Sequence, residues 1–352
     1  MSRRYLIILS ATMLATFVAV WVWVAAMPMA YLDPEYPAWL AKEQMLASCD
    51  LGELMVVGDS RAAVDVMPSL LPVKATNLAV GGGSPIEAYV AVARALTCAE
   101  PPRRVIVSMG AAHFTEPYLF WERTVRFGFV GGDDLAELLR VSRWLGDRTY
   151  YDLRRADGLP APARAVLYAV RLPSLYFNSL VKGGVFLRWW NNKAALAAGF
   201  AARGQYFFGT DNGSSVVAVE GALRDFTPLP VLDHYFDRML AQLAEQGIAV
   251  DFVAMPMNQA TWQAVRPEVR AAFAAYLDGY AARYPNFRVV GDIMPHWPDR
   301  WFGDGYAHLN PAGARRFSEE LAVWLESERR APSPAARRTA ENAERRTIRM
   351  VQ

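Results

Sequence analysis

The 352-residue sequence predicts an α/β protein built around a doubly wound parallel sheet of about five strands. Two patterns support this expectation. Short apolar runs alternate with segments of helical periodicity, and polar candidate site residues follow directly after several of these runs. A third pattern, an uncharged N-terminal run, adds one transmembrane helix. The length allows a large buried core, as one big domain or as a domain with an elaboration.

The first predicted element is an apolar helix near the N-terminus. No charged residue occurs from Tyr5 to Leu32, whereas about 20 apolar residues suffice for a helix to cross a bilayer. Arg3 and Arg4 precede the run, so the positive-inside rule places the N-terminus in the cytoplasm. A cleaved signal peptide is the alternative, although its apolar region usually has about 7–15 residues. We expect a transmembrane anchor over residues 1–32, and both interpretations export the remainder.

An alternation of strands and helices follows a short, partly helical approach over residues 34–51. The predicted strands are residues 53–57, 75–80, 104–109, 250–255 and 287–290. The predicted helices are residues 62–70, 87–96, 233–246, 265–283 and 313–326. This order predicts a flavodoxin-like sheet, whose ligands bind at the carboxyl ends of the strands. The two parts of the domain are residues 33–115 and 230–328.

Residues 116–229 interrupt the alternation, and we expect them to form an insertion or cap over the site. The segment is rich in aromatic residues, among them Trp121, Trp144 and Trp190. These side chains could stack on sugars or dock against a membrane partner. A core of the insertion itself is the expected role for most of them.

The charge is unevenly distributed. From Arg329 to the end, seven arginines oppose two glutamates, which gives +5; the whole chain carries +2, so the remainder carries about −3. Residues 329–352 are poor in large apolar side chains, and we expect a disordered basic tail. This tail could touch anionic lipid or polysaccharide or simply be solvated. Nothing in the sequence is typical of a nucleic-acid-binding module.

The chain has two cysteines, Cys49 and Cys98, each a few residues before a predicted strand. If those strands are neighbours in a parallel sheet, both cysteines lie at the same edge. An exported protein could then join them as a disulfide. The alternative is two unpaired small residues.

The tetrad Gly58-Asp59-Ser60-Arg61 follows the first predicted strand and precedes a helix. A serine at such a turn has its hydroxyl lifted out of the sheet and backed by free amide groups, as an acyl-transfer nucleophile requires. The plainer interpretation of Ser60 is a helix cap. Arg61 could bind an acidic sugar or be solvated.

The search for a base is short, because the chain has four histidines: His113, His234, His296 and His308. Asp304 precedes His308 by four residues and could orient its ring. His113 follows the third predicted strand, which favours a place in the site. The histidines and cysteines do not have the spacing of a metal site, and we expect no metal and no cofactor.

Together these motifs resemble the SGNH (GDSL) hydrolase superfamily. The match covers roughly residues 50–115 and 230–327 and rests on Gly58-Asp59-Ser60, on Asn77 with the following glycines, and on Asp304 and His308. The resemblance implies that Ser60 is the nucleophile, His308 the base and Asp304 its orienting acid. It also implies an oxyanion hole from the amides of Ser60 and Gly82, with Gly81, Gly83, Arg61 and His113 in contact with substrate.

Two positions depart from the pattern of the superfamily. Its usual asparagine after the third strand, a further oxyanion donor, falls here on Ala112, so that His113 could donate instead or the hole is weaker. The acidic residue normally precedes the histidine by three positions, where this chain has Gly305. A loop can absorb this one-residue shift to Asp304.

The anchor, the glycines before Ser84-Pro85, and the ending His308-Leu309-Asn310-Pro311 narrow the likeness. They resemble the membrane-anchored proteins that acetylate exported alginate or cellulose and, more distantly, proteins that transfer D-alanine to teichoic acids. That likeness implies an inner-membrane, single-pass protein with its domain in the periplasm. Its partners would be an exopolysaccharide acceptor and a membrane-bound O-acyltransferase as the acyl donor.

Three functions are compatible with these features. The leading expectation is O-acetyl transfer to polysaccharide hydroxyls through an acyl-Ser60 intermediate. A carbohydrate acetylesterase would use the same three residues. A non-catalytic SGNH-like scaffold of an acetylation complex is the third, and separated side chains of Ser60, His308 and Asp304 would favour it.

Overall fold

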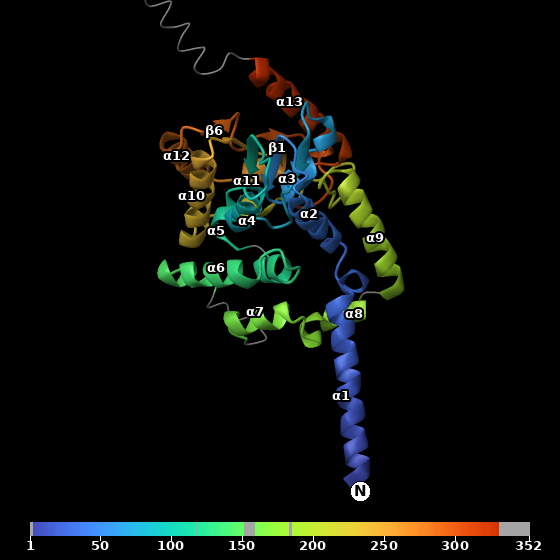
Figure 1. The fold of residues 1–352 in the computed structure, drawn as a ribbon. Coiled ribbons are helices and arrows are strands. Elements are labelled where there is room, and N and C mark those ends of the chain that lie inside the picture. Colours follow the sequence, from blue (N-terminus) through green and yellow to red (C-terminus); the bar gives the residue numbers. More distant parts are fainter. Residues whose placement is uncertain (1–2, 118, 151–158, 183–184, 331–352) are drawn as a thin grey trace, which may run out of the picture.

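The computed structural model describes residues 3–117, 119–150, 159–182 and 185–330 (Figure 1). Its centre is a five-stranded sheet in which every neighbouring pair is parallel. The strand order is β2-β1-β3-β4-β6, with β1 at Leu54–Gly58, β2 at Ala75–Asn77, β3 at Arg104–Ser108, β4 at Ala249–Val253 and β6 at Phe287–Val290. The prediction of an α/β fold with five parallel strands is therefore confirmed. Of the expected basic tail, residues 331–352 lie outside the described residues.

Four of the strands are almost wholly buried, which explains why they are continuous apolar runs in the sequence, whereas in the edge strand β6 only Phe287 is buried. On one face, Met55, Val105 and Phe252 belong to a large core that includes residues of helices α2, α4, α10 and α12. On the other face, Val56 and Ile106 pack with residues of α3 and α13. Helices thus cover both faces of the sheet. Their bounds are α2 Tyr36–Ser48, α3 Ser60–Asp65, α4 Pro85–Ala95, α10 Pro230–Glu245, α12 Pro267–Arg283 and α13 Pro311–Arg330.

Several predicted boundaries were wrong, and each has a local cause. The helix expected at 62–70 ends at Asp65, and a 3-10 turn, Pro68–Leu70, follows it. The strand expected at 75–80 ends at Asn77, whose side chain donates to the carbonyls of Ala62 and Val66 and diverts the chain from the sheet.

The later helices also differ from the prediction at their ends. The segment expected to be one helix over 265–283 is preceded by a separate short helix, α11 (Gln259–Ala264), because Pro267 starts a new helix. Helix α13 begins at Pro311, and the side chain of Asn310 accepts from the Gly313 amide as its cap. A small parallel pair outside the main sheet, β5 (Met257–Asn258) with β7 (His296–Trp297), was not predicted.

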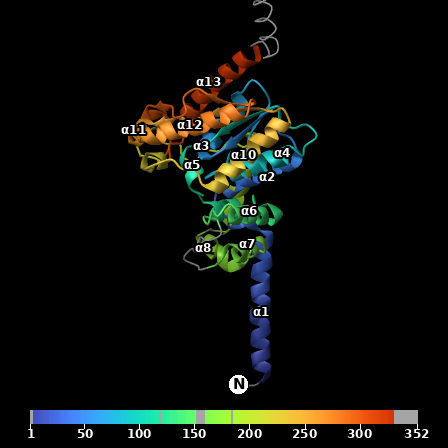
Figure 2. The ribbon, with the colours of Figure 1, turned by 90° about the vertical axis from the view of Figure 1, so that its left-hand side faces the viewer.

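The N-terminal helix α1 (Arg3–Ala26) projects from the α/β part (Figures 1 and 2). It is the one helix among the described residues that is long and apolar enough to cross a membrane. Helix α6 (Gly132–Trp144) lies next to the α/β part, α7 (Ala161–Ala169) and α8 (Phe177–Lys182) lie beside the last turns of α1, and α9 (Val185–Ala201) runs back along α2. The described part of residues 116–229 also includes the π-helix Phe120–Val125 and 3-10 turns, and the short helix α5 (Ala112–Thr115) precedes it.

The aromatic residues of this insertion divide into two groups. Trp121, Phe129 and Tyr176 are buried, but in the main core together with residues of the sheet and not in a separate core of the insertion, which was the role expected for most of them. Trp144 and Trp190 are exposed. The insertion is therefore continuous with the core of the α/β part rather than a separately packed cap.

Cys49 and Cys98 form a disulfide. The parallel pairing of β1 with β3 brings the segments before both strands to one edge of the sheet, as the sequence indicated. The bond closes a loop across 49 positions of sequence and joins the end of α2 to the turn after α4.

Removing this disulfide by Cys49→Ala with Cys98→Ala is expected to lower the free energy of unfolding by about 4 kcal/mol. Without the bond, the unfolded chain is no longer held in a closed loop of this length and so gains conformational entropy. Equilibrium urea unfolding under oxidising conditions measures the difference. Addition of a reductant should lower the urea midpoint of the wild type to that of the double variant and leave the midpoint of the double variant unchanged. Equal midpoints for the oxidised wild type and the variant would contradict the prediction.

Candidate active site

Ser60 is the first residue of α3, directly after the turn that leaves β1. Gly58 makes this turn possible, because a Cβ there would lie 1.8 Å from the backbone oxygen of Ser108 on β3. Its φ of +153° also favours glycine. The carboxylate of Asp59 caps the helix by accepting from the amides of Arg61 and Ala62. The cap residue is thus Asp59, which leaves the Ser60 side chain free for another role.

The Ser60 hydroxyl meets the two residues expected to join it. Nε2 of His308 lies 2.7 Å from Oγ of Ser60, and Nδ1 of His308 lies 2.6 Å from Oδ2 of Asp304. The extra residue between acid and histidine is absorbed by Ala307, which adopts a left-handed φ of +60°. Asp304 also accepts from the backbone amides of Tyr306 and His308, so the loop folds back on its own carboxylate.

The surroundings of the site keep Asp304 ionised and fix the orientation of the His308 imidazole. Burial alone would raise the pKa of Asp304, but the hydrogen bond and charge of His308 and the two amides outweigh it and lower the pKa. The ring of Phe208 stacks on the His308 imidazole with centroids 4.8 Å apart. In this arrangement His308 can accept the Ser60 proton while Asp304 compensates the developing imidazolium charge.

Ser60, His308 and Asp304 open into a cavity of about 410 Å³. The wall opposite them comes from the insertion, through Leu119, Arg123 and the stretch 218–220. The insertion thus contributes to the wall of the cavity, as a cap over the site would. None of the described residues of α6 to α9 lines it, and the contribution comes from the π-helix Phe120–Val125 with Leu119 before it, from Phe208, and from the stretch 218–220.

The three glycines after β2 have different places. Gly82 lines the cavity with a left-handed φ of +72°, as a turn facing the site requires. Gly81 lies behind it, where a Cβ would meet the carboxylate of Glu35, which is held by Arg123 at 2.8–3.0 Å. Gly83 approaches the carbonyl of Gly58. Gly81 and Gly83, expected to contact substrate, therefore shape the turn and do not line the cavity.

The structure decides against one of the two roles expected for Arg61. It is 5% exposed, so the solvated alternative is wrong, and its guanidinium pairs with the buried carboxylates of Asp59 and Glu220. Burial opposes the charge of Arg61, but these carboxylates outweigh it and raise the pKa of the guanidinium. Arg61 still lines the cavity, as an already paired cation.

His113 lies on α5 and also lines the cavity, with Nε2 3.4 Å from Oδ2 of Asp59. Asp59 is fully buried, yet the charges of Arg61 and His113 and the amide of Gly110 keep its pKa low against the effect of burial. Only a glycine fits at position 110, because a Cβ there would clash with the guanidinium of Arg61 that pairs with Asp59.

Sequence analysis missed three residues that hold the site together. Phe208 lies in an irregular stretch of the insertion and Glu220 in the one-turn 3-10 helix Val219–Ala222, and neither belongs to a motif, so no signal pointed to them. Asp65, on α3, accepts from the Leu309 amide and ties the His308 loop to the helix of Ser60. Burial raises the pKa of Asp65 well above its ordinary range. A single aspartate in a short helix gives no sign of this role.

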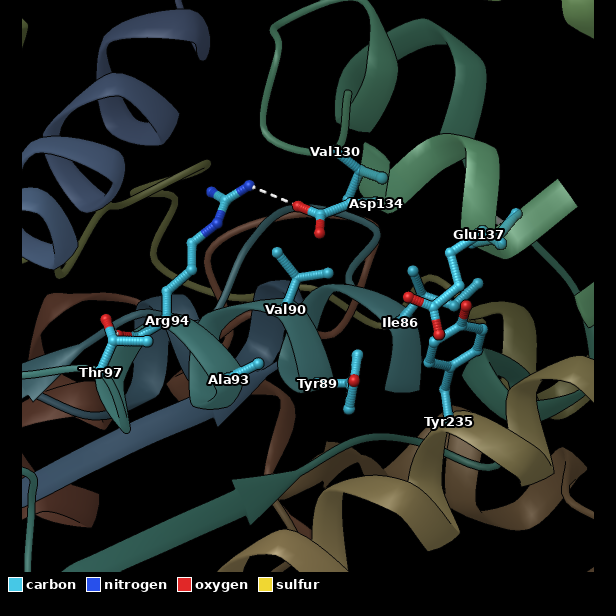
Figure 3. Close-up of a pocket in the computed structure, with 11 residues that line it drawn as sticks. Ile86, Tyr89, Val90, Ala93, Arg94, Thr97, Val130, Asp134, Glu137 and Tyr235 are labelled. Carbon is cyan, nitrogen blue, oxygen red and sulfur yellow. Dashed lines mark hydrogen bonds and ion pairs between the residues drawn. The ribbon is translucent and has the colours of Figure 1, made fainter. Parts of the chain in front are cut away.

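The other histidines lie elsewhere. His234 is on α10, against Trp144, and His296 stacks on Trp262. In the described part of the chain, no group of three His, Cys, Asp or Glu side chains could hold a metal ion. A second cavity, of about 210 Å³, lies between α4 and α6 and is bordered by the Arg94–Asp134 ion pair (Figure 3). It shares no residue with the cavity at Ser60.

The close approach at Gly58 generates a stability test. Gly58→Ala is expected to lower the free energy of unfolding by about 1–3 kcal/mol, because the backbone of Ser108, which cannot move aside as a flexible side chain could, occupies the space of the new methyl group. Gly279→Ala, in open space on α12, is the matched control and should stabilise by up to about 1 kcal/mol. Urea unfolding of both variants measures this, and similar effects of the two would contradict it.

The lowered pKa of Asp304 generates a pH test. A carboxyl whose pKa is lower in the folded state stabilises the protein above its unfolded pKa of about 4, and this contribution disappears as the pH falls through the folded value. The unfolding free energy of wild type minus that of Asp304→Asn should therefore be largest near neutral pH and shrink below about pH 4. Parallel urea titrations measure it, and a difference that does not change with pH would refute it.

No protein-family model matches the chain, and no curated protein matches it at a significant level. The geometry around Ser60 is therefore the basis for assigning a function.

Proposed function

We propose that this protein is an SGNH-type serine O-acyltransferase that passes an acyl group, with acetyl as the leading case, to hydroxyls of an exported polysaccharide. The observation that carries the proposal is the hydrogen-bonded series Ser60–His308–Asp304 at the wall of a 410 Å³ cavity. The strand order supports a doubly wound, flavodoxin-like sheet, with the site at the carboxyl ends of the strands. The non-catalytic scaffold is disfavoured, because it predicted that the side chains of Ser60, His308 and Asp304 would be separated, whereas they are within hydrogen-bond distance.

In the first half-reaction Oγ of Ser60 bonds to the acyl carbonyl carbon while Nε2 of His308, 2.7 Å away, takes the hydroxyl proton. The tetrahedral intermediate then expels the leaving group, which receives that proton from His308. Asp304 holds Nδ1 and stabilises the imidazolium in between. The product is acyl-Ser60.

In the second half-reaction a sugar hydroxyl attacks the acyl carbon and gives its proton to His308. The ester bond to Ser60 breaks, and His308 returns the proton to Oγ. Water would complete the same cycle as hydrolysis, so transfer requires an acceptor held in place and water kept out. The apolar side chains of Leu119, Ala218 and Val219 in the cavity wall support this requirement.

The developing oxyanion needs donors, and the amides of Ser60 and Gly82 are the proposed pair. The Asp59 cap binds the next two amides of α3 and not that of Ser60. Gly82 lines the same cavity. Ala112 offers no side-chain donor, and a missing donor slows such reactions by about 10²–10³-fold. The side chain of His113, which lines the cavity and lies 3.4 Å from Asp59, could donate instead.

The anchor supports the choice of transfer and of location. Helix α1 begins with two arginines, Arg3 and Arg4, and is long enough to cross a bilayer, which agrees with a single-pass inner-membrane protein whose domain faces the periplasm. A membrane-bound O-acyltransferase in the same membrane would supply the acyl group, and an exopolysaccharide would accept it. The proposed chemistry needs no cofactor.

Full-length protein in detergent, offered an activated acetyl ester, is expected to carry acetyl on Ser60 in intact and peptide mass spectra. Ser60→Ala should carry none at that position. His308→Ala should acylate at least about 10³-fold more slowly because the proton acceptor is gone. His296→Ala is the matched histidine control and should behave as wild type, because His296 lies outside the cavity.

Acceptor addition then separates the candidate functions. Acetyl that moves from Ser60 to a short β-glucan or alginate oligomer establishes the transferase. Acetyl lost only to water indicates the esterase instead. If the folded protein never acquires acetyl on Ser60, the proposal of serine catalysis is refuted and the non-catalytic scaffold becomes the favoured function.

A further inference from the structure

The surface beside the end of α1 combines exposed apolar side chains with positive charge. On α7 and α8 and next to them, Val166, Val170, Phe177 and Val181 are 62%, 44%, 64% and 67% exposed. We call these four residues the basal surface. The two helices are neighbours, since the ring of Tyr168 on α7 contacts that of Tyr176 just before α8. Several large apolar side chains exposed on neighbouring helices of a folded domain mark a candidate contact surface.

The basal surface is fixed to the anchor. The indole of Trp21 on α1 donates to the carbonyl of Val170 at 2.7 Å, and Arg171 donates to the carbonyl of Ala25 at 3.2 Å. In both views α7 and α8 lie beside the last turns of α1, on the side of α6 away from the sheet (Figures 1 and 2). The surface therefore keeps a fixed position along the axis of α1.

The depth of that position follows from the geometry of the helix. Trp21 is 16 residues beyond Tyr5, the start of the uncharged run, which corresponds to about 24 Å at 1.5 Å per residue. A bilayer has a hydrocarbon core of about 30 Å. When α1 spans it, Trp21 and Val170 lie close to the far boundary of the core, where tryptophan is enriched and where interfacial helices insert their apolar faces.

The charge of the segment agrees with this location. From residue 158 to residue 210 the chain has no aspartate or glutamate and six basic residues: Arg164, Arg171, Lys182, Arg188, Lys193 and Arg203. Two of these six, Arg171 and Lys182, are the sequence neighbours of Val170 and Val181 in the basal surface, whereas Arg164 is buried and Arg203 pairs with Asp50 beside β2. Basic residues next to an apolar surface favour anionic lipid headgroups. A cationic, acid-free segment with exposed valines and a phenylalanine is typical of a segment that lies in a membrane interface.

We infer that α7 and α8 lie in the periplasmic leaflet of the bilayer crossed by α1, with the basal surface inserted among the lipids. The segment is thus a second, in-plane membrane contact beside the spanning helix. This inference rests on the proposed membrane anchor and goes beyond it, because an anchor alone leaves α7 and α8 in water.

Spin labels on the full-length protein in vesicles of phosphatidylethanolamine and phosphatidylglycerol test this inference. Phe177→Cys and Val181→Cys carry the label on the basal surface. Leu14→Cys, 64% exposed on α1, reports on the anchor, and Val323→Cys, 70% exposed on α13 at the opposite end, is the aqueous control. The native cysteines are paired with each other, so labelling is selective.

Collisions with oxygen, which partitions into lipid, are expected to exceed those with a water-soluble nickel chelate at residues 14, 177 and 181, with the reverse at 323. Lipid exposure at 14 but aqueous exposure at 177 and 181 would overturn the inference while leaving the anchor intact. Protection of 177 and 181 from both reagents would also overturn it, in favour of a protein contact. An aqueous residue 14 would refute the anchor and the inference together.

Discussion

The buried carboxylate of Asp59 is the interaction on which the candidate site depends. It caps α3, accepts from the Gly110 amide after β3, and pairs with Arg61, which in turn pairs with Glu220 of the insertion. A buried carboxylate that lost these partners would be strongly destabilising. Three segments that are distant in sequence are therefore held around one charge, and Ser60 is the next residue along the chain.

Much of the fold was predictable because buried parallel strands leave a strong signal. The five strands were recognised as short apolar runs, and Phe287–Val290 matched at both ends. The errors arose where side-chain hydrogen bonds or prolines override periodicity, as at Asn77 and Pro267. The helices of the insertion were not predicted individually, although α6 buries Leu135, Leu138, Leu139 and Ser142 at helical spacing.

The site was predictable only in part. The sequence placed Ser60, Asp304 and His308 in motifs, and their side chains meet. The one-residue shift of Asp304 proved harmless because Ala307 adopts a left-handed conformation, which no composition rule would assign to an alanine. The partners of Arg61 could not be foreseen, because Glu220 reaches it from 159 positions away in an irregular stretch.

The connection between α1 and α2 determines how the domain moves. A flexible linker as long as residues 27–35 would let the domain wander over about 15–18 Å. Here Tyr31 and Leu32 are buried, and Asn192 of α9 donates to the carbonyls of Met29 and Leu32, so that the segment is rigid. The α/β part is therefore not joined to α1 by a flexible linker, and the two move together. Under the proposed function, the cavity would stay at a constant distance from the membrane, and an exported polymer would meet it only at that distance.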